Sequence, residues 1–558
     1  MTAQPEVSHT APADEPPAQQ AWGQGRIALH VRVGVTGHRN VDSDDPALKQ
    51  QVREALRDIE SRCPEGSAAT PVNLAVVSAL AEGADRIVAR EAMDRGVSLE
   101  VVLPLPPDDY LTDFEADTSK SEFRTLLGKA SAITEVPIAD DRKEAYERAG
   151  QAIVDRSDVL LALWDGHAAR GRGGTAHIVS YARRQGVPVL QVPVKRLDPS
   201  SPPPRNAHEP SPPGLFALLS ASALELLDRY NSGPLRTGRT GSEPQLLPRG
   251  LKTPVPAQVH SFVTYAQPYF NRAEHVAGFW QRLFNWLALL LYVLSAAAVI
   301  IVATQIIFKR SPTIVWAEVA VLAAVVVVLA IGRWAHLHDR WLAARYLAER
   351  IRSGVFVAAV GGGGDLRSAR DGTQSEDSGS LDSNQEWVEL AFREIYLRAR
   401  RSPPAAPQLS ALKDLLIEAW IDDQACYHSR VYKRMTRRHR QLTLLAAGLF
   451  GVSALAAVFH SMSFLQSDSG YDVWGYLSVI IPAVAAAMAG YSAQRDYPRL
   501  AERSKVMVRR LQEVRQLVED CGQLSSLQEA ARKTELLMRS ETAEWYEVIR
   551  LKDLELPA

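Results

Sequence analysis

Four long apolar runs, arranged as two pairs, constrain this chain more than any other feature of its sequence. The first pair covers residues 283–308 and 314–331, and the second covers residues 442–459 and 474–491. Each run approaches the ~20 residues that a helix needs to cross a hydrocarbon layer about 30 Å thick. The sequence therefore predicts an all-α membrane domain with four transmembrane helices, organised as two hairpins.

The composition of the whole chain limits the number of its folded units and the kinds of function it can have. A length of 558 residues predicts two or three folded units. A net charge of -1 argues against direct nucleic-acid binding, which depends on clustered Lys and Arg. Cys63, Cys426 and Cys521 are far apart and match no disulfide framework or metal site. Residues 1–26 lack the apolar core of a secretory signal and are expected to form a disordered tail.

Short β-branched runs alternate with helical patterns between residues 27 and 196. In the first run, residues 29–35, apolar side chains alternate with His30, Arg32 and Gly34, and the run ends at a turn. The other strand-like runs are 72–77, 99–103, 133–136, 159–164 and 189–192, and the helical patterns between them include 46–62, 143–156 and 176–185. This alternation predicts an α/β domain, a Rossmann-like parallel sheet that helices cover on both faces.

Small and charged residues gather in the turns that follow three of these strands. In such sheets, ligands bind beyond the carboxyl ends of the strands, where backbone N–H groups at helix N-termini can hold an anion. The candidate ligand-binding residues are Thr36, Gly37, His38, Arg39, Glu82, Gly83, Asp85, Asp165, Gly166, Gly173, Gly174, Thr175 and His177. His38 and Arg39 offer positive charge for a phosphate, and residues 173–175 lead into a helix.

Each of these residues also has a purely structural interpretation. Glycines at strand–helix turns often serve only backbone geometry. His38 and His177 fit the pattern of hydrogen-bonded structural histidines equally well. Glu82 and Asp85 are typical of residues that cap the following helix. Three such turns on one sheet edge favour ligand binding over these alternatives.

The turn motifs resemble those of the SLOG superfamily, which groups LOG-type nucleotide phosphoribohydrolases with nucleotide-sensing Rossmann-like domains. The resemblance rests on GVTGHR at 34–39, AEGAD at 81–85, and WDG at 164–166 followed by GGT at 173–175. It covers roughly residues 27–194. It implies a nucleotide-derived ligand, such as an ADP-ribose-type or cyclic nucleotide signal, with Asp165 holding a ribose hydroxyl and no separate cofactor.

The same resemblance bears on catalysis. LOG-type enzymes carry a GGxGTxxE stretch whose glutamate is catalytic; laid over residues 171–178, it places Arg172 at the second glycine and Ile178 at the glutamate. Because a hydrolase needs a placed acid or base, the resemblance implies binding without catalysis. The alternative is that Glu82 or Asp165 has taken over the catalytic role.

A short repeat indicates that the membrane half is duplicated. The sequence LAER at 347–350 recurs at 500–503, an offset of 153 residues that also carries the first apolar run onto the third. We infer two copies of one unit, each with a lead-in helix, a hairpin and a trailing helix. The expected layout is a nucleotide-sensing domain at 27–196, a Pro/Gly-rich linker with a short helix at 197–257, a first unit at 258–356, a disordered linker at 357–386 and a second unit at 387–558.

This unit resembles the SLATT domain, a two-transmembrane module that is associated with SLOG sensors in bacterial conflict systems and proposed to form membrane pores. The second copy carries the resemblance more clearly, with Tyr427-His428-Ser429 ahead of its hairpin and ETAEWY at 541–546 near its end. The first copy is more degenerate but keeps Arg345 and the LAER motif.

Basic residues that flank the runs predict the membrane topology. The third run is preceded, and the fourth followed, by cations, whereas residues 461–473 contain no Lys or Arg. The flanking cations are Lys433, Arg434, Arg437, Arg438, Arg440, Arg495 and Arg499. The positive-inside rule therefore places both termini in the cytosol, although Lys309 and Arg310 oppose it.

Two residues inside the runs are unusual for a membrane helix. Glu318 lies near the start of the second run, where we expect either a pore-facing or interhelical carboxylate or a snorkelling interfacial one. Pro482 lies inside the fourth run and predicts a kink that is either functional or merely tolerated.

The leading hypothesis is a multi-pass effector in the bacterial inner membrane, in contact with lipid and assembled as a homo-oligomer. Binding of a nucleotide-derived messenger would open its membrane helices, and the leakage would stop phage replication. One alternative is a membrane-anchored nucleotide or nucleoside hydrolase of the LOG type. A constitutive channel is a third, for which the runs carry few polar residues.

Overall fold

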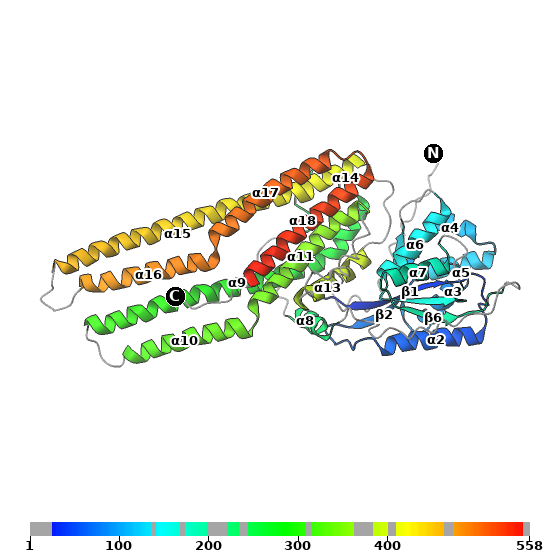
Figure 1. Ribbon diagram of the computed structural model, residues 1–558, viewed down its shortest axis with the longest axis horizontal. Helices are drawn as coiled ribbons and strands as arrows, with labels where there is room; N and C mark the ends of the chain where they lie inside the picture. The colour runs from blue at the N-terminus through cyan, green and yellow to red at the C-terminus, as the bar shows by residue number, and fades with distance from the viewer. Residues whose placement is uncertain are drawn as a thin grey trace, which may run out of the picture.

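An α/β domain and two helical hairpins lie at opposite ends of the molecule, with a helical bundle between them (Figure 1). The protein is described by a computed structural model that covers residues 25–136, 141–167, 173–197, 220–233, 244–308, 314–361, 383–399, 409–462 and 473–550. Most of the expected tail, part of the linker at 197–257, most of the linker at 357–386, and Lys309 and Arg310 lie outside these residues.

Six strands form one parallel sheet in the order β4-β3-β2-β1-β5-β6. They are β1 (Leu29–Gly37), β2 (Val72–Ser78), β3 (Ser98–Leu103), β4 (Ala132–Glu135), β5 (Val159–Trp164) and β6 (Val189–Pro193). The central strand β1 pairs with β2 and β5, so that Val33 lies opposite both Val76 and Val159. The predicted parallel sheet is confirmed, and its strand order reverses direction between β1 and β5.

Helices cover both faces of the sheet, as the alternation predicted. One face packs against α2 (Pro46–Ser61), α3 (Ala84–Met93) and α5 (Asp117–Gly128), and the other against α6 (Arg142–Arg156) and α7 (Thr175–Arg184). The short elements α4 (Pro107–Tyr110) and η1 (Leu111–Asp113) link β3 to α5. Helix α2 illustrates the local cause, because its apolar side chains recur every three or four residues and Asp45 caps its first turn. The domain is Rossmann-like.

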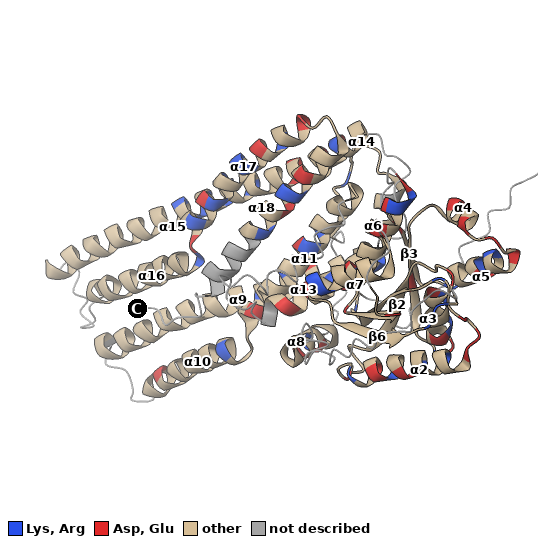
Figure 2. Cartoon of the chain, turned by 45° about the vertical axis from the view of Figure 1, so that its right-hand side comes forward, with Lys and Arg blue, Asp and Glu red and all other residues tan. Residues whose placement is uncertain are grey.

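Four helices of the C-terminal half, among the residues described, are long and apolar enough to cross a membrane. They form the hairpins α9 (Ala257–Phe308) with α10 (Ile314–Trp334) and α15 (Asp423–Ser461) with α16 (Val473–Arg495). Their ends farthest from the sheet carry few charged side chains (Figure 2), and apolar residues such as Trp316, 75% exposed, face outward. Large apolar surface of this kind is stable in lipid rather than in water, and the prediction of four apolar helices of membrane-spanning length is confirmed.

The two hairpins pack side by side through α9 and α16. The Thr304 hydroxyl lies 2.8 Å from the Tyr476 hydroxyl, and the Tyr292 ring packs against Gly490. In this arrangement Glu318 is half-buried in the second turn of α10, and Pro482 lies within the continuous helix α16.

A bundle of helices joins the hairpins to the sheet domain and has one apolar core. Its members are the first half of α9, α8 (Ala221–Ser232), α11 (Leu337–Ala359), α13 (Ser383–Ala399), α14 (Leu409–Leu415), the π-helical η3 (Leu416–Asp422), α17 (Tyr497–Glu519) and α18 (Leu524–Arg550). Phe356 stacks on Trp420 in the centre, with ring centroids 4.9 Å apart. The bundle thus fixes the position of both hairpins relative to each other.

Both hairpins turn into their trailing helices at a residue in the left-handed conformation. These residues are His336, with φ 44°, and Asp496, with φ 46°. They are 160 residues apart, whereas the LAER motifs are 153 apart, so the motif lies deeper in α11 than in α17. The order of elements repeats, but the motif does not mark the same structural position in the two halves.

Candidate functional site

The turn after β1 lies at the point where the sheet reverses its strand order. Strand β1 has β2 on one side and β5 on the other, and crevices at such switch points are where open α/β sheets bind ligands. Thr36 and Gly37 are the last two residues of β1, and His38 and Arg39 begin the turn after it. The turn after β5 contains Asp165 and Gly166. Two of the turns predicted from the sequence are therefore neighbours in space.

His38 and Asp165 are in direct contact across this switch point. The Nε2 atom of His38 lies 3.1 Å from Oδ1 of Asp165 and 3.2 Å from the backbone nitrogen of the same residue. Burial alone would raise the pKa of Asp165, but the His167 N–H group and the His38 ring outweigh it and lower that pKa. When neutral, the His38 ring accepts a hydrogen bond from the backbone N–H of Asp165. When protonated, it donates to the Asp165 carboxylate. The hydrogen bonding of this pair can therefore change when an anion binds nearby.

The turns after β1 and β2 interlock through two glycines. A side chain on Gly83, whose φ is 79°, would overlap the carbonyl oxygen of Arg39, and one on Gly37 would overlap Ala84. The Ala84 N–H donates to the His38 carbonyl oxygen at 3.1 Å. These glycines therefore have a packing role, and they hold the His38 and Arg39 backbone in place at the switch point.

Asp85 and Glu82 brace the β2 turn instead of pointing to open solvent. Asp85 is buried and accepts from the Ser78 hydroxyl and the Ala79 N–H group, both at 3.1 Å. Burial raises the pKa of Asp85 to about 6, although these hydrogen bonds oppose the rise. Glu82 accepts a hydrogen bond from Ser119. Both carboxylates thus stabilise the turn, but their hydrogen-bond partners lie outside the first turn of α3, so the structure does not show the capping role expected for them.

The fourth candidate group lies at the N-terminus of α7. Gly174 is the N-cap residue and supplies no side chain for capping, and Thr175 begins the helix. The Gly173 N–H donates to Nδ1 of His177 at 3.2 Å, and Nε2 of His177 lies 3.8 Å from Glu147. Helix α7 also contacts β1, so its N-terminal dipole adds to the positive potential around the switch point.

Ile178, at the position of the LOG-type glutamate, is a residue of α7 that is buried against α6. It is 2% exposed, and its side chain fills the space beside Gly150. A residue at this position lies in the apolar core of the domain, since Val154 and Val179 belong to the same cluster. Ile178 therefore supplies no carboxylate at the position of the LOG-type glutamate.

Sequence reasoning missed an aromatic group beside the β1 turn. The Arg39 guanidinium lies over the Tyr146 ring, 5.0 Å from its centroid, and Tyr146 hydrogen-bonds to Asp113. Tyr110 is fully buried next to them, and its hydroxyl has no hydrogen-bond partner among the described residues. The run of acidic and aromatic residues at 108–114 was the available signal, but it contains no motif.

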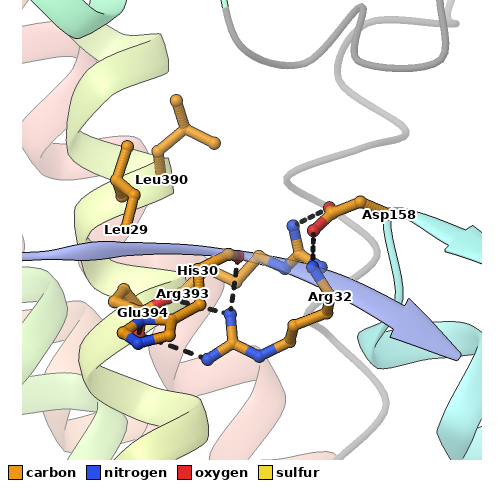
Figure 3. Close-up of a pocket in the computed structure, with 7 residues that line it drawn as sticks. All are labelled: Leu29, His30, Arg32, Asp158, Leu390, Arg393 and Glu394. Carbon is orange, nitrogen blue, oxygen red and sulfur yellow. Dashed lines mark hydrogen bonds and ion pairs between the residues drawn. The ribbon is translucent and has the colours of Figure 1, made fainter. Parts of the chain in front are cut away.

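The opposite edge of the sheet carries a second polar cluster, at the amino end of β1. A small cavity there is lined by Leu29, His30, Arg32, Asp158, Leu390, Arg393 and Glu394, which come from the sheet domain and from α13 (Figure 3). Arg32 donates to Glu394 at 2.8 Å and to Glu100 at 3.0 Å, and His30 lies 2.7 Å from Glu394. Burial alone would raise the pKa of Glu394, but the charges of Arg32 and His30 outweigh it and hold that pKa well below its usual range.

Helix α13 connects this cluster to the bundle. On the sheet side, Arg393 donates to Asp158 at 2.6 Å. On the bundle side, Glu389 accepts a hydrogen bond from Arg350 of α11 at 2.9 Å. Arg350 in turn pairs with Glu535 of α18, and all three of these bundle side chains are buried. One helix therefore contacts both the sheet domain and the trailing helices through charged side chains.

The second hairpin carries the recognisable family signature. Residues 417–545 match the model of the SMODS and SLOG-associating 2TM effector domain 1, that is, a SLATT domain. The match runs from η3 through α15, α16 and α17 into α18. A search of curated proteins finds no match to this chain.

Proposed function

We propose that this chain is a membrane effector of a bacterial conflict system in which the α/β domain senses a nucleotide-derived messenger and controls the two hairpins. The observation that carries the proposal is the buried contact between Arg32 and Glu394. Arg32 lies in β1, whose other end forms the candidate ligand turn, and Glu394 lies in α13, which also pairs with the helices behind the hairpins. A ligand that shifts β1 thus has a continuous route of packed, charged contacts to the membrane half.

The proposed messenger is an ADP-ribose-type or cyclic nucleotide. Its phosphates would lie against the backbone of residues 36–39 and the N-terminus of α7 at residues 173–175, with Arg39 supplying charge. Asp165 would accept from a ribose hydroxyl. The resemblance of the turn motifs to the SLOG superfamily supports this assignment, as does their convergence on the switch point of the sheet.

The proposed action is membrane permeabilisation by a homo-oligomer in the bacterial inner membrane, with both termini cytosolic. The four spans form a row in which α9 and α16 are the inner pair, and much of their apolar surface faces outward. A closed water-filled path needs helices from several subunits, because a single row encloses none. Both the effector domain at 417–545 and the exposed apolar helices support a membrane role.

Ligand binding is tested with the full chain in detergent. Thermal unfolding is followed with ADP-ribose and with 3′,5′-cyclic AMP, and the same mixtures are analysed for cleavage products. We expect one probe class to raise the unfolding temperature without products, because binding to the folded state alone stabilises it. Thr175→Trp, which fills the α7 turn, should abolish the rise, whereas Gln51→Trp on the exposed face of α2 should keep it.

Permeabilisation is tested in cells that express the full chain and take up the same probe. Entry of a membrane-impermeant dye should follow probe addition with the wild-type chain and with Gln51→Trp, but not with Thr175→Trp. Dye entry that persists in Thr175→Trp would show that the hairpins open without the α/β domain. Cleavage products in the binding assay would instead favour the LOG-type hydrolase, for which the contact of His38 with Asp165 offers an acid–base pair.

A further inference from the structure

We propose that one face of α15, next to the third span, binds the phosphate headgroups of anionic phospholipids. The face consists of the exposed side chains Lys433, Arg434, Arg437, Arg438 and Arg440, hereafter the basic face. The proposal rests on the membrane location of the spans that is part of the proposed function. It adds a lipid class and a binding surface to that function.

The basic face is a concentration of charge without internal neutralisation. Among the residues that the structure describes, none forms an ion pair with any of its five side chains. Helix α15 contains one acidic residue, Asp423, and this lies at its far N-terminal end. Because like charges on one helix face destabilise it by themselves, the arrangement indicates an anionic partner outside the chain.

The opposite face of α15 explains why these cations point outward. Met435 is buried there against Tyr497 and Ala501 of α17, with Val431 and Leu442 packed beside them. A helix that buries one face in this way presents the remaining positions to its surroundings. The direction of the basic face is therefore set by the packing of α15 against α17.

The distance to the membrane matches the headgroup layer. The third apolar run begins at Leu442, so a rise of 1.5 Å per residue places residues 433–440 within about 14 Å of it. The polar headgroup layer extends several ångströms beyond the hydrocarbon on each side, and long cationic side chains reach toward it. Figure 2 shows basic residues on α15 where the helix leaves its uncharged end. Basic clusters beside a span are attracted to anionic lipids.

The first hairpin lacks such a face, which argues that the cluster has a specific role. In the corresponding part of α9, Arg272 is buried and donates to the carbonyl oxygens of Tyr230 and Asn231. Glu274 pairs with Arg345 at 2.7 Å. Two single exposed cations, Arg282 and Arg333, lie at the membrane boundary there, beside the exposed Trp334 at 85% exposure. Within the described residues, the cluster of five cations would thus make the second hairpin the more responsive of the two to the charge of the lipid surface.

The test uses the full chain in phosphatidylcholine vesicles that contain a trace of photoactivatable phosphatidylglycerol or photoactivatable phosphatidylcholine. The reactive group lies on the acyl chain close to the glycerol, and labelled peptides are mapped by mass spectrometry after digestion at apolar residues. We expect the phosphatidylglycerol probe to label residues 430–445 at least about fivefold more than the phosphatidylcholine probe. High salt should reduce this preference in the wild-type chain, because the basic face is exposed.

The matched variants carry equal changes in net charge. Arg434→Gln/Arg437→Gln/Arg438→Gln should lose the preference, whereas a triple change at exposed cations of α17 and α18, Arg509→Gln/Arg510→Gln/Lys533→Gln, should retain it. Equal labelling of residues 430–445 by both probes, or a preference that survives the first triple change, would overturn the proposal. If the first triple variant does not fold, the wild-type chain is compared at low and high salt. A phosphatidylglycerol preference that high salt does not reduce would then overturn the proposal.

Labelling elsewhere separates this proposal from the proposed membrane location. Both probes should label the spans at 283–308 and 474–491 in every folded variant. Unlabelled spans would refute the membrane location, whereas labelled spans without a phosphatidylglycerol preference at 430–445 would refute the basic face alone. A short RNA that binds the wild-type chain and not the first triple variant, with no lipid preference, would identify nucleic acid as the partner instead.

Discussion

The Arg32 guanidinium donates a 2.8 Å hydrogen bond to the Glu394 carboxylate, although the two residues are 362 positions apart in the chain. Both side chains are buried, Arg32 at 1% and Glu394 at 5% exposure. Arg32 also pairs with Glu100 of β3, and Glu394 with His30 of β1. A buried ionic cluster therefore holds the membrane half against the sheet. The loss of any one of its charges would destabilise the fold.

Glu394→Gln should destabilise the full chain, because it leaves the buried Arg32 with one carboxylate partner. Removing one member of a buried ion pair costs roughly 3–5 kcal/mol, so we expect a clear fall in the thermal unfolding temperature in detergent. The control is Asp58→Asn, which removes the exposed pair of Asp58 with Arg62 and should cost at most about 1 kcal/mol. Equal unfolding temperatures for the two variants would mean that the cluster does not hold the halves together.

The stability of the chain should depend on the protonation of Asp85. Its pKa is raised to about 6 from 3.8, so the folded state holds a proton that the unfolded state has already lost between these pH values. Stability from this group is therefore present below about pH 3.8 and falls as the pH rises to about 6, by on the order of 3 kcal/mol.

Asp85→Asn should remove this part of the pH dependence. Asparagine stays neutral and keeps a carbonyl oxygen for the Ser78 hydroxyl or the Ala79 N–H group. Thermal unfolding of both proteins at pH steps from about 4 to 8 measures the difference. The prediction is wrong if the wild-type chain and the variant lose stability in parallel over that range.

Gly83→Ala should disrupt the candidate ligand edge. The change adds strain at φ 79° and also drives a methyl group into the Arg39 carbonyl, so we expect a loss of about 2–4 kcal/mol. Gly96→Ala is a matched control, because Gly96 has φ 76° but nothing within 4 Å of the added carbon. Gly96→Ala should lose only the stability that backbone strain costs, about 1–2 kcal/mol. The difference between the two unfolding temperatures isolates the contact between the two turns.

The local parts of the fold could be predicted from the sequence. The alternation at 29–35 and the helical spacing of α2 each depend on which face of a single element is buried, and this is visible within a few residues. The same holds for the apolar runs of the hairpins, which require only length and composition. The turns at 36–39 and 165–166 could be placed together because parallel strands end at one edge.

The contacts between distant segments could not be predicted. Nothing near residue 394 indicates that α13 packs on β1, since the partners meet only when the bundle and the sheet have both formed. Arg32 did carry a signal, because a charged residue in a central, doubly covered strand requires a buried partner. The identity of that partner depends on tertiary packing. The sequence around Asp85 fits both the ligand-binding and the structural interpretation for the same reason, because the partners of its carboxylate depend on tertiary packing.

Ile178→Glu restores the residue type of LOG-type enzymes, and the structure predicts that it will damage the fold rather than create a hydrolase. Ile178 is 2% exposed and lies against Gly150 in an apolar cluster, so a carboxylate there would be buried without a partner. We expect a loss on the order of 3 kcal/mol or more. Ser180→Glu, on the exposed face of the same helix, should change stability little. Unfolding temperatures and release of base from nucleoside monophosphates measure both properties. A stable Ile178→Glu chain that releases base would show that this position faces the ligand and that one substitution separates a sensor from an enzyme.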